Sequence, residues 1–405
     1  QGIARGGWPG QRGQMELVNP NSSYTWTEPL DIHGVPMMGV FQKQGTLFVR
    51  HAWLAAREDD SINADALGNA IRNQWRPLSR PTREAALGMY ARRDAPAMPK
   101  YFIVETVATC SRRCPFCTIN VMKRYGPDGQ LAKPGRLEWR GFIKLMQELG
   151  PTEPYGLSAY QLGEPLNYVG HDEEGKKKDI GDLVDTAKRI GNFRVVNVST
   201  HGDVTNLYRL LECDIDDLIV SIDGTTAETY QKNRPMANGK DMGSFERTVS
   251  RVKEFLALKA RRGISKPWVM MQVINSELTR DEILPFILEW IEVDGVDSVY
   301  IKNLDSMRSW LGNKMVSDEE DAIKAARVED MPCQHLWGIG SMVFTGQFNA
   351  CAHDAYTELV DGRTIYNSTF AEWWHGSFMT ELRRQHSSGH FRMPCKECRE
   401  RDPWL

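Results

Sequence analysis

Several patterns that mark common protein classes are missing from this 405-residue chain. No apolar run reaches the roughly 18 residues that a membrane span requires, and no basic segment followed by an apolar one opens the chain, as it would in a secretory signal. The net charge is only −3, and no block of Lys and Arg exceeds a few residues. We therefore expect neither nucleic acid nor an anionic membrane as the main partner.

Common nucleotide-binding and protease motifs are missing as well. The chain has no Walker loop, no GxGxxG segment and no zinc-protease motif. Cysteine is scarce, with 8 residues, but these residues cluster at two places. Clustered cysteines in a chain of this length favour metal binding in a reducing compartment over disulfides, so the sequence predicts a cytoplasmic protein.

The first cluster is the segment CSRRCPFC, which contains Cys110, Cys114 and Cys117. Disulfide pairing would leave one of them over, and the segment is too tight to join any two without strain. Three thiolates on one short loop can instead bind three irons of a four-iron cluster, because thiolate is the ligand that selects such clusters. The fourth iron then lacks a protein ligand and is open to another molecule.

Strand-like and helical patterns alternate from residue 98 to 310. Helical patterns such as DIGDLVDTAKRIG and DVTNLYRLLEC separate six strand-like runs, at 101–108, 156–161, 194–199, 217–222, 268–274 and 297–303. Six βα units predict an α/β fold, an open (β/α)6 partial TIM barrel with a parallel sheet. In such folds the functional residues gather at the carboxyl ends of the strands, and the cysteine loop follows the first strand.

Different patterns flank the barrel. Residues 1–97 predict an N-terminal extension, with a hairpin in GVFQKQGTLFVRHAWL and helices at 62–75 and 81–94, that packs on the barrel or helps to bind substrate. Residues 311–332 predict a helical linker. Residues 333–405 contain short strand-like runs, a Trp-rich helical pattern and four cysteines. They predict a small metal-bound module, because so short a segment needs a bound metal or a similar cross-link to fold.

Short polar segments follow the next three strands. They contain Gly163, Glu164 and Pro165 after the second strand, Ser199, Thr200 and His201 after the third, and Ser221, Asp223 and, further on, Arg234 after the fourth. Each segment alone is weak evidence, since SIDG could be a plain turn. Together with the cysteine loop, their order and spacing resemble the radical S-adenosylmethionine superfamily.

The resemblance implies a cofactor and a set of ligands. In that family S-adenosylmethionine chelates the open iron, and an electron from the cluster cleaves it to a 5′-deoxyadenosyl radical that abstracts a substrate hydrogen. The segment around Glu164 would meet the methionine amino group, the segment around Thr200 would lie near the ribose, and Ser221 and Arg234 would hold the carboxylate. Phe116 belongs to the cysteine motif, while Leu162 replaces a family glycine.

The resemblance also implies a flavodoxin- or ferredoxin-type reductant. The alternative is a structural zinc loop that shares a distant cysteine, although zinc sites favour paired C-x2–4-C knuckles.

The second cysteine cluster comprises Cys333, Cys351, Cys395 and Cys398. These four residues resemble the twitch form of the SPASM module. By that resemblance they would saturate an auxiliary [4Fe–4S] cluster, which would transfer an electron rather than bind substrate. A zinc site with four cysteine ligands is the alternative.

Cys213 is the remaining cysteine. A thiol near a radical site could donate a hydrogen atom, as some radical epimerases require. A helix-to-strand junction is also an ordinary core position for cysteine, and we favour that interpretation.

Other polar residues could act on a substrate. His353 and Asp354, with His335, flank the auxiliary cysteines, and Tyr160 and Gln161 lie at a strand end. They could bind or deprotonate a substrate, because oxidation of a radical that bears a hydroxyl group also releases a proton. Histidines beside a cluster loop equally often donate hydrogen bonds to sulfur.

The substrate class follows only from the resemblance. A single four-cysteine auxiliary site is most similar to carbohydrate and aminocyclitol enzymes of aminoglycoside (antibiotic) pathways, such as the deoxy-scyllo-inosamine dehydrogenase. This predicts oxidation of a sugar-like alcohol, with epimerisation and dehydration as variants. A peptide-modifying maturase ranks second, because those relatives often carry seven auxiliary cysteines and a peptide-recognition domain that residues 1–97 match poorly. A non-catalytic iron–sulfur electron carrier is disfavoured, because it has no use for an open iron.

Overall fold

The computed structural model describes five N-terminal strands and residues 95–120, 126, 128–303, 332–333, 335–354 and 356–398. The N-terminal strands form an antiparallel sheet: β1 (Met15–Leu17), β2 (Tyr24–Thr27), β3 (Leu30–Ile32), β4 (Val35–Gln44) and β5 (Leu47–Ala55). β4 and β5 form the hairpin expected from the sequence. The helices expected at 62–75 and 81–94, and nearly all of the expected linker at 311–332, lie outside the described residues.

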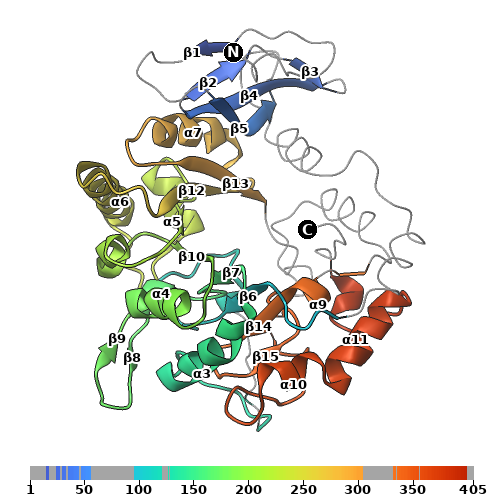
Figure 1. The fold of residues 1–405 in the computed structure, drawn as a ribbon. Helices are drawn as coiled ribbons and strands as arrows, with labels where there is room; N and C mark the ends of the chain where they lie inside the picture. The colour runs from blue at the N-terminus through green and yellow to red at the C-terminus, as the bar shows by residue number, and fades with distance from the viewer. Residues whose placement is uncertain are drawn as a thin grey trace.

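Six parallel strands form the central sheet (Figure 1). They are β6 (Tyr101–Val104), β7 (Gly156–Ser158), β10 (Val195–Thr200), β11 (Asp217–Ser221), β12 (Trp268–Asn275) and β13 (Ser298–Asn303). Each pairs with the next in chain order, which confirms the expected open α/β barrel. β6 and β7 are shorter than expected, because the chain beyond them leaves the ladder to form the loops of the site.

The C-terminal segment extends this sheet. β14 (Ile339–Met342) runs parallel to β6, and β15 (Phe348–Asn349) pairs antiparallel with β14. The apolar core is continuous across the junction, since the Phe102 ring on β6 lies 5.2 Å from the Phe370 ring. Figure 1 shows the same arrangement, with the C-terminal elements in orange and red beside β6. The cysteines of residues 333–405 therefore lie on a direct extension of the barrel.

Helices cover the outer side of the sheet. The described helices are α3 (Trp139–Leu149), α4 (Ile180–Arg189), α5 (Ala227–Asn233), α6 (Ser244–Arg261), α7 (Ile283–Ile291), α9 (His335–Gly338), α10 (Phe370–Trp374) and α11 (Ser377–Ser387). Capping boxes begin two of them: Asp179 with Asp182 at α4, and Thr369 with Glu372 at α10. DVTNLYRLLEC, expected as an α-helix, forms the 3-10 helix η4 (Thr205–Leu211).

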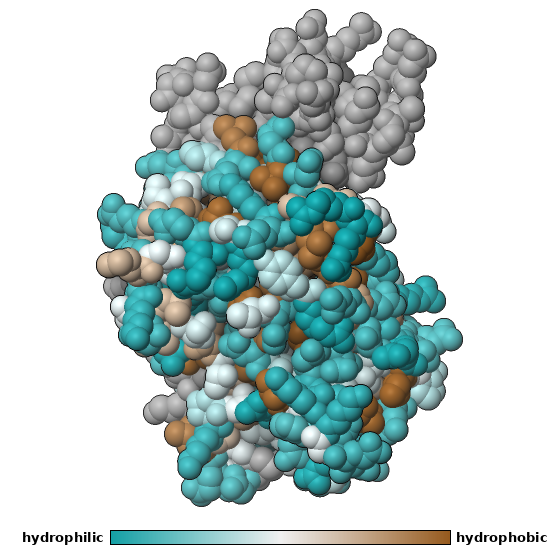
Figure 2. Space-filling view, turned by 90° about the vertical axis from the view of Figure 1, so that its left-hand side faces the viewer, coloured by the Kyte–Doolittle hydropathy of each residue, from teal (hydrophilic) through white to brown (hydrophobic). Residues whose placement is uncertain are grey.

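The outer surface matches this arrangement. Figure 2 shows a mostly hydrophilic face on which hydrophobic residues occur singly or in small groups. The charged segment at 172–179 forms the turn and the second strand of a short hairpin, in which β9 (Lys177–Lys178) pairs with β8 (Gly170–His171). Among the described residues, no helix combines the length and apolarity needed to cross a membrane.

Asp216 ties the amino ends of the strands together. Its Oδ2 accepts hydrogen bonds from the Val196 backbone N–H and from Lys188 Nζ, both at 2.8 Å, and its Oδ1 accepts from Lys266 Nζ. Burial alone would raise the pKa of this carboxyl group, but the hydrogen bonds from the two lysines outweigh burial and lower the pKa below its ordinary value. The ionised form is therefore stabilised by folding.

We expect Asp216→Asn to lower the free energy of unfolding by about 1–3 kcal/mol at neutral pH, because two ammonium groups lose a charged acceptor. The folded pKa is below the unfolded value of about 3.9, so this contribution is present above that value and disappears as pH falls through the folded pKa. Urea unfolding of both proteins at neutral and acidic pH measures the difference. Glu228→Gln, which breaks an exposed pair with Lys232, is the control and should change little. An Asp216→Asn effect that does not diminish at acidic pH would contradict this assignment.

Candidate active site

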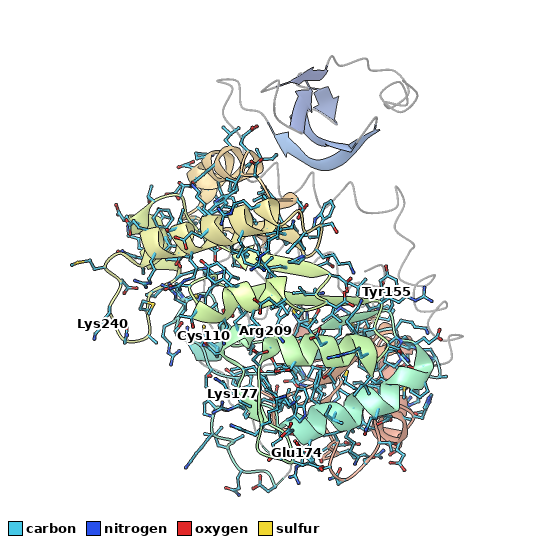
Figure 3. All side chains as sticks on the ribbon, turned by 60° about the vertical axis from the view of Figure 1, so that its left-hand side comes forward. Cys110, Tyr155, Glu174, Lys177, Arg209 and Lys240 are labelled. Carbon is cyan, nitrogen blue, oxygen red and sulfur yellow. The ribbon has the colours of Figure 1, made fainter. Side chains whose placement is uncertain are left out.

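A cavity of about 350 Å³ opens at the carboxyl ends of the parallel strands. In Figure 3, Cys110 lies on the opposite side of the barrel from Tyr155, which precedes β7 at the amino end. Most of the expected cluster and cofactor residues line this cavity: Cys110, Cys114, Phe116, Cys117, Gly163, Glu164, Ser199, Thr200, His201, Ser221 and Arg234. Residues from four consecutive strand ends thus meet in one place.

The cysteine loop is held from the side by the segment after α5. Arg113 N–H donates to the Pro235 carbonyl at 2.8 Å, and Ala237 N–H donates to the Ser111 carbonyl at 2.7 Å. Arg112 and Met236 thereby form an antiparallel bridge. Because this pairing uses the backbone between Cys110 and Cys114, it fixes the path of the loop while the thiols face the cavity.

Three thiols of one loop line this cavity, and thiolate is the ligand type that selects iron–sulfur clusters. Burial raises the pKa of Cys110 and of Cys114 to about 12. Grouped, buried thiols lose their protons readily only when a cation supplies compensating charge, so the donor set fits a cluster of iron ions. Within the described residues, no three Cys, His, Asp or Glu side chains converge closely enough to hold a single metal ion.

Glu164 lines the cavity and is only 1% exposed. Its Oε1 accepts from Thr200 Oγ1 at 2.8 Å, and its Oε2 accepts from the His201 backbone N–H at 3.0 Å. Gly163 permits this placement: its φ is +87°, and a Cβ atom there would lie 2.2 Å from the Val107 carbonyl oxygen. The segment after β7 therefore packs tightly against the segment after β6.

His201 adds a hydrogen-bond donor beside the cysteine loop. Burial lowers the pKa of this imidazole, which favours the neutral form. Nδ1 accepts a hydrogen bond from the Asp203 N–H at 3.1 Å, so the proton is on Nε2. Nε2 lies 3.2 Å from Ser111 Oγ and 3.3 Å from Glu164 Oε2.

Arg234 supplies a buried positive charge. Its Nε donates to Asp223 Oδ2 at 2.7 Å, and its Nη2 pairs with the same oxygen at 2.7 Å. Burial opposes the guanidinium charge, but the Asp223 carboxylate raises the pKa of Arg234 above its ordinary value. Asp223 also accepts from the Ile274 N–H at 2.8 Å, and the guanidinium carbon lies 5.7 Å from the centre of the Phe116 ring. Asp223 thus orients Arg234 from behind the cavity wall.

Arg112 links these parts. It is 1% exposed, and it donates from Nη1 to the Arg234 carbonyl at 2.9 Å and from Nη2 to Asp203 Oδ2 at 2.7 Å. Its guanidinium carbon also lies 5.2 Å from the centre of the Tyr230 ring. One side chain therefore joins the cysteine loop to the ends of β10 and α5.

The remaining walls of the cavity carry both polar and apolar residues. The residues there are Ser158, Tyr160, Gln161, Gln272, Lys302, Ala352 and His353, with Ile103 and Ile274. Burial raises the pKa of Tyr160, which keeps its hydroxyl group protonated. Gln272 Nε2 donates to Ser221 Oγ at 2.8 Å. Sequence reasoning missed Gln272 and Lys302. The position of Lys302 at the end of β13 could have suggested it, whereas Gln272 lies within β12.

The auxiliary cysteines lie beside this cavity. Burial, and then the nearby sulfurs of Cys333 and Cys398, raise the pKa of Cys351 well above its ordinary value. Cys395 begins the 3-10 helix η7 (Cys395–Glu397), and the N–H of Cys398 donates to the Cys395 carbonyl. Ala352 and His353, which directly follow Cys351, line the cavity. The C-terminal cysteine loop is therefore one of its walls.

Besides Asp223, which lies behind the cavity wall, three expected residues are not part of the cavity lining. Cys213 precedes the amino end of β11, its thiol contacts the Leu210 carbonyl, and burial raises its pKa to about 12. Asp354 is fully buried, and its carboxylate accepts from the N–H groups of Tyr356 and Leu359. Pro165 begins the 3-10 helix η3 (Pro165–Asn167). Because Cys213 is at the other end of the barrel, the structure removes the reason to regard it as a hydrogen donor.

Comparison with solved structures identifies the fold. Streptococcus suis SuiB bound to precursor peptide SuiA is 10% identical, and the match covers 79% of this chain and 71% of SuiB with a TM-score of 0.52. SuiB bound to S-adenosylmethionine is also 10% identical, and the match covers 80% of this chain and 74% of SuiB with a TM-score of 0.51. This chain has the fold of SuiB. BtrN in complex with AdoMet and 2-DOIA is 17% identical over 76% of this chain and 98% of BtrN, with a TM-score of 0.45.

No family model matches the sequence, and no curated protein matches it significantly.

We expect Arg112→Lys to weaken binding of S-adenosylmethionine, the cofactor expected from the sequence, by about tenfold or more, because an ammonium group cannot reach both Asp203 and the Arg234 carbonyl with the guanidinium geometry. Equilibrium dialysis of reconstituted protein measures this, with iron content determined on the same samples. Arg113→Lys is the matched control, because Arg113 is the exposed neighbour in the same loop. Equal affinities for both variants would contradict a linking role for Arg112.

Proposed function

We propose that this chain is a radical S-adenosylmethionine enzyme. One observation carries the proposal: three thiols on a single loop share a cavity with Glu164, His201 and Arg234, which come from three other strand ends. Neither a zinc knuckle nor an electron carrier requires these groups around the thiols. The fold shared with SuiB, which has been solved with S-adenosylmethionine, supports the proposal.

The charges in the cavity match the methionine part of this cofactor. Cys110, Cys114 and Cys117 would bind three irons and leave the fourth for the amino and carboxylate groups. Glu164 offers a carboxylate for the ammonium group. Arg234 offers Nη1 for the carboxylate, because Asp223 engages the other side of its guanidinium fork.

The proposed reaction is oxidation of an alcohol on a carbohydrate or aminocyclitol in natural-product biosynthesis. When bound, the cofactor and its cluster supply a hydrogen-abstracting 5′-deoxyadenosyl radical, and an auxiliary cluster on Cys333, Cys351, Cys395 and Cys398 accepts the remaining electron. Gln161, Gln272 and Lys302 line the cavity and support this substrate class, since their side chains can orient hydroxyl groups. We assign His353 to receive the hydroxyl proton, and Tyr160, whose hydroxyl group stays protonated, only to pass it on. A flavodoxin- or ferredoxin-type protein would reduce the radical-generating cluster.

A peptide-modifying maturase is the second candidate. The shared fold with SuiB, which has been solved with its precursor peptide SuiA, favours it. Incubation with aminocyclitols and, separately, with peptides encoded nearby distinguishes the two, because each substrate class would lose two mass units on oxidation. Deuterium uptake from solvent without mass loss would instead indicate epimerisation.

We expect Cys114→Ala to abolish formation of 5′-deoxyadenosine and to remove about four of about eight irons, because the radical-generating cluster loses a ligand. Anaerobic reduction with S-adenosylmethionine, followed by chromatography and iron analysis, measures both. Continued cofactor cleavage in this variant would contradict the assignment of Cys114 as a ligand of the radical-generating cluster.

Cys213→Ala is the matched cysteine control. We expect it to retain the iron content, cofactor cleavage and product formation of the unmodified chain, because its thiol lies outside the cavity. Loss of product with intact cofactor cleavage would restore Cys213 as a hydrogen donor.

Cys351→Ala tests the auxiliary site separately. We expect it also to lose about four irons but to retain cofactor cleavage, since the first cluster keeps all its ligands. The same iron and chromatography measurements apply, and an iron content equal to that of the unmodified chain would exclude the auxiliary cluster.

A further inference from the structure

Three polar side chains extend from the sheet into the cavity: Ser158, Tyr160 and Lys302. Successive residues of a strand face opposite sides of a sheet. Ala159, which lies between the first two, and Ile301, which precedes the third, are buried in the apolar core. Ser158, Tyr160 and Lys302 therefore face the inner side of the barrel. Each of them is only half-buried, so a molecule in the cavity can contact them.

Tyr160 and Lys302 interact although their strands are not neighbours. β10, β11 and β12 separate β7 from β13 in the sheet, so this interaction crosses the interior of the barrel. Burial raises the pKa of Tyr160, and the Lys302 ammonium group is the strongest opposing influence, followed by a hydrogen bond with Ser158. Asp217 acts in the same direction as burial but less strongly than Lys302. The Tyr160 hydroxyl group therefore lies near a positive charge inside the barrel.

The hydrogen bond with Ser158 leaves the Tyr160 hydroxyl group free to donate. This bond lowers the pKa of Tyr160, so the Ser158 hydroxyl group donates it and the Tyr160 oxygen accepts it. The Tyr160 O–H is then available to a ligand. An ammonium group has three N–H donors, so its interaction with Tyr160 does not exhaust Lys302 either.

The proposed cofactor uses the other charged side chains of the cavity. Glu164 is assigned to its ammonium group and Arg234 to its carboxylate group. Among the described residues of the lining, Lys302 is then the lysine or arginine left for the substrate. A hydroxyl donor and a cation side by side match the two oxygens of an anion, because hydrogen bonds to an ionised acceptor are the strong ones.

We propose that Tyr160 and Lys302 form a substrate subsite for an anionic group, a carboxylate or a phosphate. An amino group at this position would meet the like charge of Lys302, so the subsite rejects it. The inference narrows the proposed substrate class to acidic carbohydrates, with any amino group bound elsewhere in the cavity. It rests on the proposed function in assigning Glu164 and Arg234 to the cofactor.

Anaerobic calorimetric titration of the reconstituted protein tests the subsite. Saturating S-adenosylmethionine keeps Arg234 occupied. The anionic probes are D-glucuronate and D-glucose 6-phosphate, and the matched probes without negative charge are D-glucuronamide and D-glucosamine. We expect the anions to bind about tenfold more tightly than the other two probes. Similar affinities for all four, or no binding, would overturn the proposal.

Variants locate the preference. Lys302→Met keeps the length of the side chain but removes its charge, so it should reduce the preference to about twofold or less. Lys302→Arg should retain most of it, which also shows that a folded cavity tolerates substitution here. Tyr160→Phe should reduce it to an intermediate value, because one donor of the two is lost. A preference that survives Lys302→Met would show that the anions bind elsewhere and would overturn the proposal.

Lys240→Met is the matched control. Lys240 is exposed on the loop before α6 and is not part of the cavity lining (Figure 3). We expect this variant to keep the full preference for anions. An equal loss in Lys240→Met and Lys302→Met would indicate general attraction to basic side chains, which contradicts a subsite.

The same samples separate this inference from the proposed function. Formation of 5′-deoxyadenosine without any probe reports on the radical chemistry alone. A protein that prefers the anions, loses the preference in Lys302→Met and forms no 5′-deoxyadenosine retains the subsite and loses the proposed function. A protein that forms 5′-deoxyadenosine without the preference retains the function and overturns the subsite.

Discussion

The buried guanidinium group of Arg112 is the constraint on which the site depends. Asp203, its carboxylate partner, is shared with Arg247 and Arg251 on the surface of α6. Asp203 is therefore neutralised several times over, and it anchors Arg112 rather than merely pairing with it. A buried ion pair contributes little to stability unless its geometry is good, but it penalises other arrangements strongly. If the cysteine loop moved away from the ends of β10 and α5, Arg112 and Asp203 would be left buried without each other, so such arrangements are disfavoured.

The acidic groups of the cavity are oriented in the same manner. Glu164 and Asp223 are almost fully buried, and each carboxylate accepts backbone N–H groups as well as a side-chain partner. Backbone donors do not change rotamer, so the two carboxylates are held whether or not a ligand is present. Preorganisation of this kind lowers the cost of binding a zwitterion, because little has to move when the ligand enters.

The sequence predicted those parts of the site that depend on local order. The six strands and the segments at their carboxyl ends follow from alternation along the chain, and that alternation also places Cys213 at the opposite end. Arg112 could not be predicted to be central, because its partners Asp203 and Arg234 are 91 and 122 residues away. The pairing of β14 with β6 was equally hidden, since a short apolar segment does not specify which sheet edge it joins.

That pairing explains why the C-terminal cysteines reach the cavity at all. β14 continues the barrel sheet past β6, and the antiparallel β15 returns beside it, so the chain after β15 leads back along the sheet toward the amino ends of the parallel strands. The contact of Gln161 with Ala352 then closes the wall across a sequence separation of 191 residues. A module joined only by a linker could shift relative to the barrel, whereas strands of one sheet are held by a ladder of backbone hydrogen bonds. The separation between the two cysteine sets is therefore set by sheet geometry.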